Sequence, residues 1–434
     1  MTSGQSSAAE RPDLAAAVRS GTVADQFGVQ HSCSISYQGK QLDLGCDLQT
    51  VTTAPWSAAL AVNDTPQGYG PADLAQAYGL PANVSGPQNT VTIVGVGAYP
   101  NLESDLAKYR SSYGLPACTT TNGCLSITDY HGGAPLQPSE PQIEETYAEE
   151  TALDVDMASA SCPSCKISMV QIPFDIGKLL EASLFGDSVP LADDFGTAVN
   201  QAVGKGTSSV SMSYGLPSGS HGAELATGAA AQALDHPGVA IVASSGDKGF
   251  TGNTQLWPSL VPTVTAAGGI TLTKSGSGYA QTAWGAVHKG TFDGPGSGCS
   301  NDSGPAVGQP DSVAAYCGGH RAVADVSADA DPATGVSVYD TWNPDGNGPS
   351  GWVVVGGTSA ASPYIAGLYA RAGNLSGVHG PNTLYAATGG IHDVTTGSNS
   401  QSGNCGSLPQ ATCVAGPGWD GPTGVGTPQG LSAF

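Results

Sequence analysis

The sequence predicts an α/β fold in which helices cover a mostly parallel sheet. Four short apolar segments have the character of buried strands, and Gly-poor segments with helical character separate them along the chain. The 434 residues are 39% hydrophobic, which is enough for a large core. The expected strands are Thr90 to Val96, Lys166 to Ile172, Ser208 to Ser213 and Val239 to Ala243, and the expected helices lie near residues 102–112, 149–160, 222–235 and 359–371.

The chain divides into two unequal parts. Residues 1–65 are polar and weakly periodic, so we expect an N-terminal extension or the remnant of a prosegment. From Tyr69 onward, strand and helix patterns follow one another to the C-terminus. The sequence therefore predicts one large domain over residues 66–434.

The charge balance narrows the classes of partner. The chain has 35 Asp and Glu residues against 13 Lys and Arg residues, a formal net charge of −22, which argues against nucleic acid. Only 11% of residues are charged, against about 25% in ordinary domains, so acid would break few ion pairs. No apolar segment reaches the ~18 residues of a membrane span, so we expect no membrane partner. We also expect a monomer.

Ten cysteines fall into five local pairs. An even number of cysteines in short loops suggests disulfides and an oxidising compartment, and the pairs by position are Cys33 with Cys46, Cys118 with Cys124, Cys162 with Cys165, Cys299 with Cys317, and Cys405 with Cys413. A zinc or redox role for Cys162 and Cys165 is the alternative. The first residues have no basic and apolar signal region, so we expect a signal that has been removed and a secreted protein.

A serine lies where a strand should pass into a helix. The apolar segment Trp352 to Val355 is followed by the octet Gly356-Gly357-Thr358-Ser359-Ala360-Ala361-Ser362-Pro363. Glycines permit a sharp turn there, and the N-terminal amides of the helix would favour a developing negative charge. Ser359 is therefore a candidate nucleophile. The alternative is an ordinary helix cap.

Two carboxyl groups are placed to act together. Residues 149–158 contain neither Gly nor Pro and should be helical, so Glu150 and Asp154, four residues apart, lie on one face. Two adjacent carboxyls tend to share a proton, which leaves one of them as a base in acid. The alternative is that the acidic run Glu144, Glu145, Glu149 and Glu150 is a solvated surface.

A third acidic residue follows a predicted strand. The strand Val239 to Ala243 ends in Ser244-Ser245-Gly246-Asp247-Lys248-Gly249, and ligand sites collect at such strand ends in parallel sheets. Asp247 is thus a candidate site residue. The alternative is a simple turn in which Asp247 accepts hydrogen bonds from local amides.

Together these motifs resemble the sedolisins, serine-carboxyl peptidases with a subtilisin-like fold. The serine octet is common to sedolisins and subtilisins, but the chain lacks the subtilisin Asp after the first strand and the His-Gly-x-His helix start. Glu150-x-x-Leu153-Asp154 and Ser245-Gly246-Asp247-x-Gly249 are similar to sedolisin motifs, and the resemblance extends over about residues 69–434.

The resemblance implies a three-layer fold and a role for each motif. Ser359 would be the nucleophile, Glu150 its general base, Asp154 the partner of the base, and Asp247 a donor in the oxyanion hole. It also implies that Ser213-Tyr214-Gly215 binds the substrate backbone. Some sedolisins have a Glu after the first strand and a Trp in the later motif, where this chain has Gly95 and Tyr214.

A calcium ion is a further implication of the resemblance. His392-Asp393-Val394-Thr395 and Ala415-Gly416-Pro417-Gly418-Trp419-Asp420 are similar to the two halves of the sedolisin calcium site. The implied ligands are the carboxylates of Asp393 and Asp420 and the carbonyls of Val394, Gly416 and Gly418, for one structural Ca²⁺. The alternative is two acidic turns.

We expect a secreted, acid-active peptidase that cleaves proteins or peptides. A carboxyl base stays partly ionised at pH values at which a histidine is protonated. Endopeptidase and tripeptidyl-peptidase action both remain open. One alternative is a catalytically silent, calcium-stabilised secreted binding protein, and the other is a neutral subtilisin-type protease, which the absence of the subtilisin His and Asp motifs disfavours.

Overall fold

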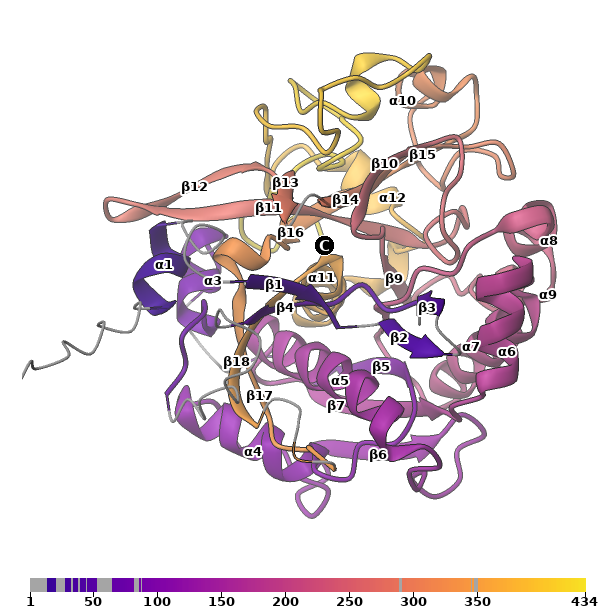
Figure 1. Ribbon diagram of the computed structural model, residues 1–434. Coiled ribbons are helices and arrows are strands. Elements are labelled where there is room, and N and C mark those ends of the chain that lie inside the picture. The colour runs from indigo at the N-terminus through magenta and orange to yellow at the C-terminus, as the bar shows by residue number, and fades with distance from the viewer. Residues whose placement is uncertain are drawn as a thin grey trace, which may run out of the picture.

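The fold is built on an eight-stranded sheet, in the order β12-β11-β9-β8-β5-β7-β6, with β16 also paired to β11 (Figure 1). The computed structural model describes residues 14–20, 28–32, 34–37, 40–43, 45–52, 65–81, 86, 88–288, 291–344, 346 and 350–434. All pairs of this sheet are parallel except β11 with β12. Its strands are β5 (Thr90–Val96), β6 (Leu125–Asp129), β7 (Lys166–Ile172), β8 (Ser209–Met212), β9 (Ala240–Ser244), β11 (Thr265–Ser275), β12 (Gly278–Ala283) and β16 (Val326–Asp329).

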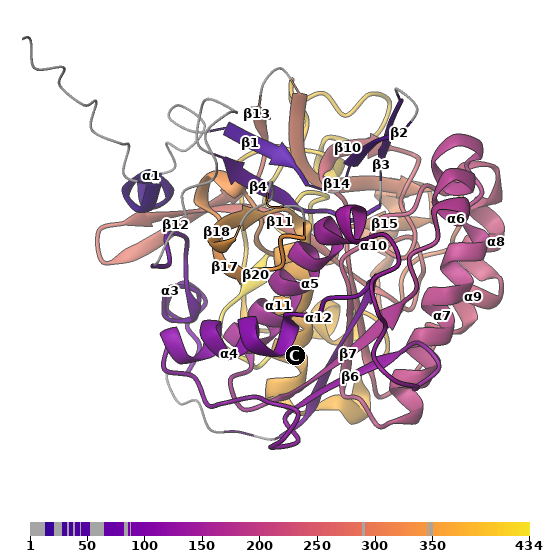
Figure 2. The same ribbon diagram turned by 60° about the horizontal axis from the view of Figure 1, so that its bottom comes forward.

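Helices lie on both sides of this sheet. Figure 2 shows α4, α5 and α11 on one side of β6 and β7, and α6 to α9 on the other. The result is the predicted three-layer α/β architecture. The helices are α1 (Leu14–Ser20), α3 (Pro71–Ala77), α4 (Leu102–Ser112), α5 (Pro141–Ser161), α6 (Ile176–Leu180), α7 (Val189–Gly204), α8 (Gly222–Thr227), α9 (Ala229–Gln232), α10 (Asp311–Ala314), α11 (Thr358–Ala372) and α12 (Asn382–Ala386).

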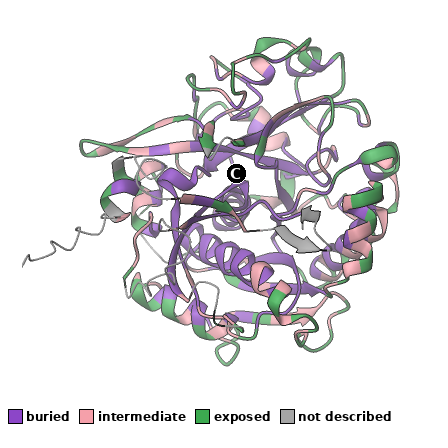
Figure 3. Ribbon diagram, in the orientation of Figure 1, coloured by how far each residue is buried: buried purple, intermediate pink, exposed green. Residues whose placement is uncertain are grey.

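Two helices, α5 and α11, form the centre of the molecule and pack against each other. They are buried along most of their length, whereas the outer helices also have exposed faces (Figure 3). A Cβ atom on Gly367 of α11 would lie 1.9 Å from Ser161 Oγ of α5. Glycine is therefore required at this crossing, and the close approach fixes one helix against the other.

A smaller antiparallel sheet joins the N-terminal part of the chain to the strand before α11. Its order is β1 (Gly28–His31), β4 (Gln49–Thr52), β18 (Gly351–Gly356) and β17 (Val336–Asp340). Thr50 pairs with Val355 and Gln49 with Gly356. This pairing brings residues 49–52 beside the start of α11.

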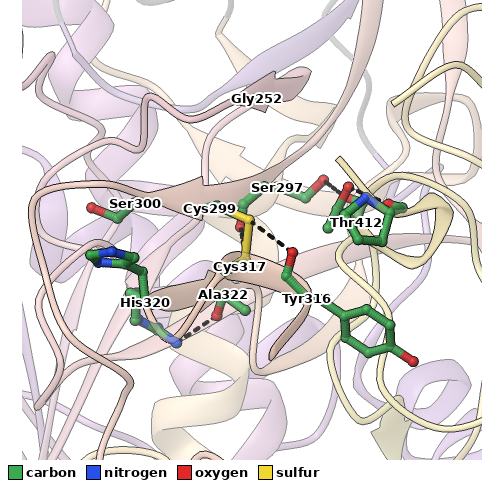
Figure 4. The surroundings of a disulfide bond; sticks show 12 residues. Gly252, Ser297, Cys299, Ser300, Tyr316, Cys317, His320, Ala322 and Thr412 are labelled. Atoms are coloured by element: carbon green, nitrogen blue, oxygen red, sulfur yellow. Dashed lines mark hydrogen bonds between the residues drawn. A yellow bond between two sulfur atoms is a disulfide. The ribbon is translucent and has the colours of Figure 1, made fainter. Parts of the chain in front are cut away.

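The remaining strands include those in the upper part of the molecule in Figure 1 and a separate two-stranded hairpin. Figure 4 shows the disulfide between Cys299 and Cys317, beside which Ser297 Oγ donates to the Thr412 carbonyl at 2.7 Å. These contacts tie the C-terminal loops to a strand. The strands are β2 (Ser34–Tyr37), β3 (Lys40–Asp43), β10 (Lys248–Gly252), β13 (Ala286–His288), β14 (Thr291–Ser300), β15 (Arg321–Val323), β19 (Ile391–His392) and β20 (Thr427–Pro428).

The predicted strands agree with the structure to within two residues at each end. The helix expected over residues 149–160 begins earlier, at Pro141, because a proline is well tolerated in the first helical turn. The helix expected over residues 222–235 is interrupted at Gly228, whose extended backbone separates α8 from α9.

Four of the five predicted cysteine pairs form disulfides: Cys118–Cys124, Cys162–Cys165, Cys299–Cys317 and Cys405–Cys413. Cys46 is also disulfide-bonded, but its predicted partner, Cys33, lies outside the described residues. None of the described helices is both long enough and apolar enough to cross a bilayer.

Candidate active site

Ser359 lies at the start of the central helix α11 and directly follows a strained turn. Gly357 has a φ of +103°, which side-chain-bearing residues rarely adopt, and a Cβ atom there would lie 2.0 Å from the Asp47 carbonyl oxygen. The Ser359 hydroxyl donates a hydrogen bond to Glu150 Oε2 at 3.0 Å. The serine octet thus gives a buried hydroxyl that is directly paired with a carboxyl group.

The partner carboxyl comes from the neighbouring helix α5. Asp154 lies one helical turn after Glu150, and its Oδ1 accepts a 2.6 Å hydrogen bond from Ser213 Oγ. Glu150 Oε1 and Asp154 Oδ2 are buried and have no hydrogen-bond partner among the described residues. A proton shared between these two oxygens would satisfy both groups.

Burial sets the protonation of this pair. Desolvation raises the pKa of Glu150 well above its ordinary value, and the charge of Asp154 raises it further, whereas the Ser359 hydrogen bond lowers it. Desolvation likewise raises the pKa of Asp154 well above its ordinary value, against the hydrogen bond from Ser213. Burial therefore favours a proton on the pair, and the singly protonated pair holds one basic oxygen.

Asp247 follows β9 and faces the same turn. Its Oδ1 accepts hydrogen bonds from the Thr358 N–H at 2.7 Å and from Thr358 Oγ1 at 2.9 Å. A Cβ atom on Gly357 would lie 2.6 Å from Asp247 Oδ2, so this second oxygen lies beside the turn that leads to Ser359. Desolvation is the main cause that raises the pKa of Asp247 to about 7, so below that pH the group is neutral and can donate a hydrogen bond.

The acidic run around the pair is not a solvated surface. Glu144, Glu149 and Glu150 are all buried. Glu149 Oε1 accepts a hydrogen bond from Thr50 Oγ1 at 2.7 Å, and Glu144 accepts the backbone N–H groups of Ser139, Glu140 and Ala98. The alternative interpretation of a solvated run is therefore wrong for these residues, because each carboxyl is engaged inside the fold.

Ser213, Tyr214 and Gly215 lie at the end of β8, beside the nucleophile. The Ser213 carbonyl is 3.5 Å from Ser359 Oγ, and the backbone of Tyr214 pairs with Cys46 in an antiparallel bridge. The Tyr214 ring points into the core, where Val96 N–H donates to its hydroxyl. The main chain of these residues is thus the part that pairs with an extended segment, here residues 45–47.

Sequence reasoning missed the segment that covers this site. Residues 45–51 are buried over the candidate catalytic residues, and the Ser359 N–H donates to the Asp47 carbonyl at 3.3 Å. The Asp47 side chain accepts a 2.7 Å hydrogen bond from Ser244 Oγ. The three consecutive β-branched residues Thr50, Val51 and Thr52 are a strand signal, but the run is short and lies in an otherwise polar region.

The predicted calcium residues lie in two loops that meet. Asp393 Oδ2 accepts the Gly418 N–H at 2.8 Å, and Asp420 Oδ2 accepts the Gly416 N–H at 3.0 Å. Asp420 is buried and feels the charge of Asp393, and no described Lys, Arg or His residue forms an ion pair with either carboxylate. Carboxylate oxygens are ligands of the kind that a hard divalent cation takes, and Asp420 Oδ1 also accepts the Thr423 N–H and hydroxyl, each at 2.9 Å.

Taken together, the site has a buried hydroxyl, a carboxyl group bonded to it that has a buried carboxyl neighbour, and two groups that can donate to an oxyanion. The donors are the Ser359 N–H and protonated Asp247. This combination is suited to acyl transfer. No histidine takes part in the hydrogen bonds of Ser359, Glu150, Asp154 or Asp247 that the described residues form.

Two known proteins have similar sequences. The chain is 30% identical to kumamolisin of Bacillus sp. (strain MN-32) over 390 residues, which cover 84% of this chain and 63% of kumamolisin. It is 27% identical to sedolisin of Pseudomonas sp. (strain 101) over 403 residues, which cover 84% of this chain and 60% of sedolisin. The chain thus spans less than two thirds of the length of the curated relatives it matches.

A solved structure has the same fold. Pseudomonas sedolisin, a serine-carboxyl proteinase in complex with pseudo-iodotyrostatin, superposes with a TM-score of 0.64 and 24% identity, over 84% of this chain and 96% of that one. No protein-family model matches the sequence. From its similarity to kumamolisin and sedolisin along most of its length, together with this common fold, we conclude that the chain belongs to the sedolisin family.

Proposed function

We propose that this protein is a serine-carboxyl peptidase that hydrolyses peptide bonds in acid. The observation that carries the proposal is the hydrogen bond from Ser359 Oγ to Glu150 Oε2, and no histidine in the described part of the chain is hydrogen-bonded to either group. A serine hydroxyl needs a base, and among the described residues Glu150 is the titratable group in contact with it.

The proposed reaction is a two-step acyl transfer. Ser359 Oγ attacks the peptide carbonyl while Glu150 takes its proton, and that proton then passes to the departing amine. The Ser359 N–H and protonated Asp247 stabilise the negative charge on the carbonyl oxygen. Water repeats the sequence on the acyl-enzyme, with Glu150 again accepting the proton. Asp154 acts through Glu150, because its charge state sets that of the base.

Acid activity follows from the protonation states that the site needs. Asp247 must be neutral, which holds below about pH 7. The Glu150–Asp154 pair must hold a single proton, so fully protonated pairs at low pH are inactive. Secretion is part of the proposal, supported by the disulfides, which persist in oxidising compartments.

Cleavage of a denatured protein at pH 4 tests the proposal. Ser359→Ala should abolish cleavage, with a loss of at least about 10³-fold, because triad members act as one unit. Asp156→Asn is a matched control, since Asp156 is also buried on α5 but its Oδ2 accepts the Tyr339 N–H, which the amide oxygen of Asn would still accept. Equal activity of Ser359→Ala and the wild type would refute the proposal.

We also propose that Asp393 and Asp420, with the carbonyls of Val394, Gly416 and Gly418, hold one structural calcium ion. When bound, the ion would neutralise two neighbouring carboxylates and link the two loops. Chelator treatment at pH 5 should lower the melting temperature, and added calcium should restore it. An unchanged melting temperature after chelator treatment would count against the proposed calcium site.

A further inference from the structure

A cavity of about 410 Å³ lies at the edge of the eight-stranded sheet opposite the candidate active site. Its lining includes Lys166, the first residue of β7, and Gln88, which precedes β5. These residues lie at the amino ends of two parallel strands, whereas Ser213 and Asp247 follow the carboxyl ends of β8 and β9. Because the amino and carboxyl ends of parallel strands lie at opposite edges of a sheet, this cavity is separate from the candidate active site.

Two disulfides fix the walls of this cavity. Cys118–Cys124 closes a loop between α4 and β6, and Cys162–Cys165 closes the turn between α5 and β7. The two loops are in contact, because Cys124 Sγ lies 3.6 Å from the Cys165 carbonyl oxygen. Asn122 braces the first loop, since its Oδ1 accepts the Cys124 N–H at 3.0 Å. The cavity is therefore preformed, as small-molecule sites usually are, and its volume is in their range.

Arg110, in the last turn of α4, contributes a buried guanidinium group to the lining. Its Nε, Nη1 and Nη2 donate to the Pro116 carbonyl at 2.6 Å, Ser159 Oγ at 2.9 Å and the Pro163 carbonyl at 2.7 Å. All three acceptors are neutral, and no carboxylate in the described part of the chain forms an ion pair with Arg110. Since a guanidinium group has five N–H donors, one N–H on each Nη atom has no acceptor among the described residues.

The buried charge of Arg110 is not compensated by a charge of opposite sign in the way that another buried charge in this protein is. Burial without a paired anion is costly for a cation, and desolvation lowers the pKa of Arg110 to about 10. Arg321 is also fully buried, but its Nη1 and Nη2 donate to the two carboxylate oxygens of Asp325 at 2.7 and 2.6 Å. An anion in the cavity would give Arg110 the charged partner that Asp325 gives Arg321.

A second cation lines the same cavity. Lys166 is exposed, and its ammonium group forms no ion pair with a described residue. None of the described residues that line the cavity is acidic, although the whole chain has 35 Asp and Glu residues against 13 Lys and Arg residues. Two positive charges without an acidic residue in the lining make the cavity locally positive, which favours an anion.

The remaining walls favour an anion that carries an apolar group. Pro116, Ala117 and Pro163 line the cavity together with the half-cystine Cys124. Inorganic phosphate would leave these apolar surfaces without a contact, whereas a carboxylate attached to a small hydrocarbon group would contact both the cations and the walls. A carboxylate also has the planar shape that a guanidinium group binds well.

We propose that this cavity binds a small organic acid, with the carboxylate held by Arg110 and Lys166 and the apolar part against Pro116 and Pro163. The site is independent of the proposed peptidase function, because none of the proposed catalytic residues lines it. Arg110 supplies the buried charge and two N–H donors, and Lys166 supplies the exposed charge. Binding is therefore measured directly, without an assay of cleavage.

Calorimetric titration of the full chain with benzoate at pH 6 tests the proposal, and benzamide is the neutral probe of nearly the same shape. At this pH a carboxylate is ionised and the side chains of Lys and Arg are charged. We expect benzoate to bind with a dissociation constant below about 10 mM, and benzamide to bind at least about tenfold more weakly, because a hydrogen bond to a charged group is worth about 1.5–3 kcal/mol. No benzoate binding below about 10 mM, or equal affinities for the two probes, would overturn the proposal.

Two charge-reversal variants and a second anion locate the site. Arg110→Gln would also remove hydrogen bonds that hold two loops, so Lys166→Glu is the decisive variant, because Lys166 is exposed and the fold does not depend on it. Lys166→Glu should weaken benzoate binding at least about tenfold, whereas Lys205→Glu, the same change at an exposed position outside the cavity, should stay within about twofold of the wild type. Unchanged benzoate affinity in Lys166→Glu would overturn the assigned site. Inorganic phosphate should bind more weakly than benzoate, and phosphate that binds equally tightly or more tightly would overturn the assignment of an organic acid.

Discussion

At the scale of single residues, Asp247 gives the site its clearest electrostatic feature. Its Oδ1 accepts two hydrogen bonds from Thr358, which orients the carboxyl so that Oδ2 lies beside the turn at Gly357. Burial raises the pKa of Asp247 to about 7. A proton on Oδ2 would thus be present throughout the acid range, and lost as the pH rises above neutral.

Asp247→Asn should keep a hydrogen-bond donor at this position while removing the group that titrates. The Asn amide donates at every pH, and its oxygen still accepts from Thr358, so we expect acid activity within about tenfold of the wild type and a smaller loss between pH 6 and 8. Asp247→Ala should lose about 10²- to 10³-fold at all pH values. The measurement is kcat/KM against pH for the three proteins, and an Asn variant as inactive as the Ala variant would contradict this role.

At the scale of elements, the crossing of α5 and α11 brings the proposed base to the proposed nucleophile. Glu150 and Ser359 come from these two helices, and Gly367 lets the helices approach so closely that a Cβ atom would be 1.9 Å from Ser161 Oγ and 3.3 Å from the Ala158 carbonyl. The distance between the catalytic groups therefore depends on a glycine about two helical turns from Ser359.

Gly367→Val should force the two helices apart. We expect the free energy of unfolding to fall by about 1–3 kcal/mol, the usual effect of overpacking, with a larger loss in kcat than in substrate binding. Gly204→Ala on α7 is the control, because its Cβ atom would meet no atom within 4 Å and alanine favours a helix. Denaturant unfolding and steady-state kinetics give the two quantities, and wild-type values for Gly367→Val would contradict the account.

At the scale of the whole molecule, buried carboxyl groups set the pH range of stability. Burial is the main cause that raises the pKa of each of eight such groups. The pKa rises to about 7 for Glu149, Asp247 and Asp420, and it lies well above its ordinary value for Glu150, Asp154, Asp156, Asp329 and Asp340. In the unfolded chain these groups titrate near pH 4. Between the two values the folded chain holds more protons, so the free energy of unfolding falls as the pH rises.

The protein should therefore be more stable at pH 4 to 5 than at pH 8. Glu149→Gln removes one of these groups, so the slope of unfolding free energy against pH should become shallower by about 1.4 kcal/mol per pH unit between about pH 4.5 and 7. Thermal and denaturant unfolding should be measured with excess chelator, so that the proposed calcium ion does not contribute. A melting temperature that rises from pH 5 to pH 8 would contradict this prediction.

The sequence predicted the central layers because their signals are local. Strand β5 is an apolar run of β-branched residues, and the spacing of Glu150 and Asp154 along a helix dictates that they share a face. The structure then brings Ser359, Glu150, Asp154 and Asp247 together, although they are far apart in sequence. Their assigned roles came from the resemblance to sedolisins and stay predictions until variants are measured.

The segment over the active site could not be predicted in the same way. Gly45, Cys46 and Asp47 form no periodic pattern, and their position depends on main-chain pairing with Ser213 to Gly215, more than 160 residues later in the chain. Such pairing is nearly independent of side-chain identity, so the sequence carries little signal for it. The break at Gly228 was missed for a related reason, because an alanine-rich pattern continues on both sides of it.

The central claim is that Glu150 is the base for Ser359, and the pH dependence of kcat/KM for the wild type and Glu150→Gln tests it most directly. The account predicts an acid optimum for the wild type and a loss of at least about 10³-fold in Glu150→Gln across pH 2 to 8, with the Asp156→Asn control unchanged. A neutral optimum that persists in Glu150→Gln would contradict it.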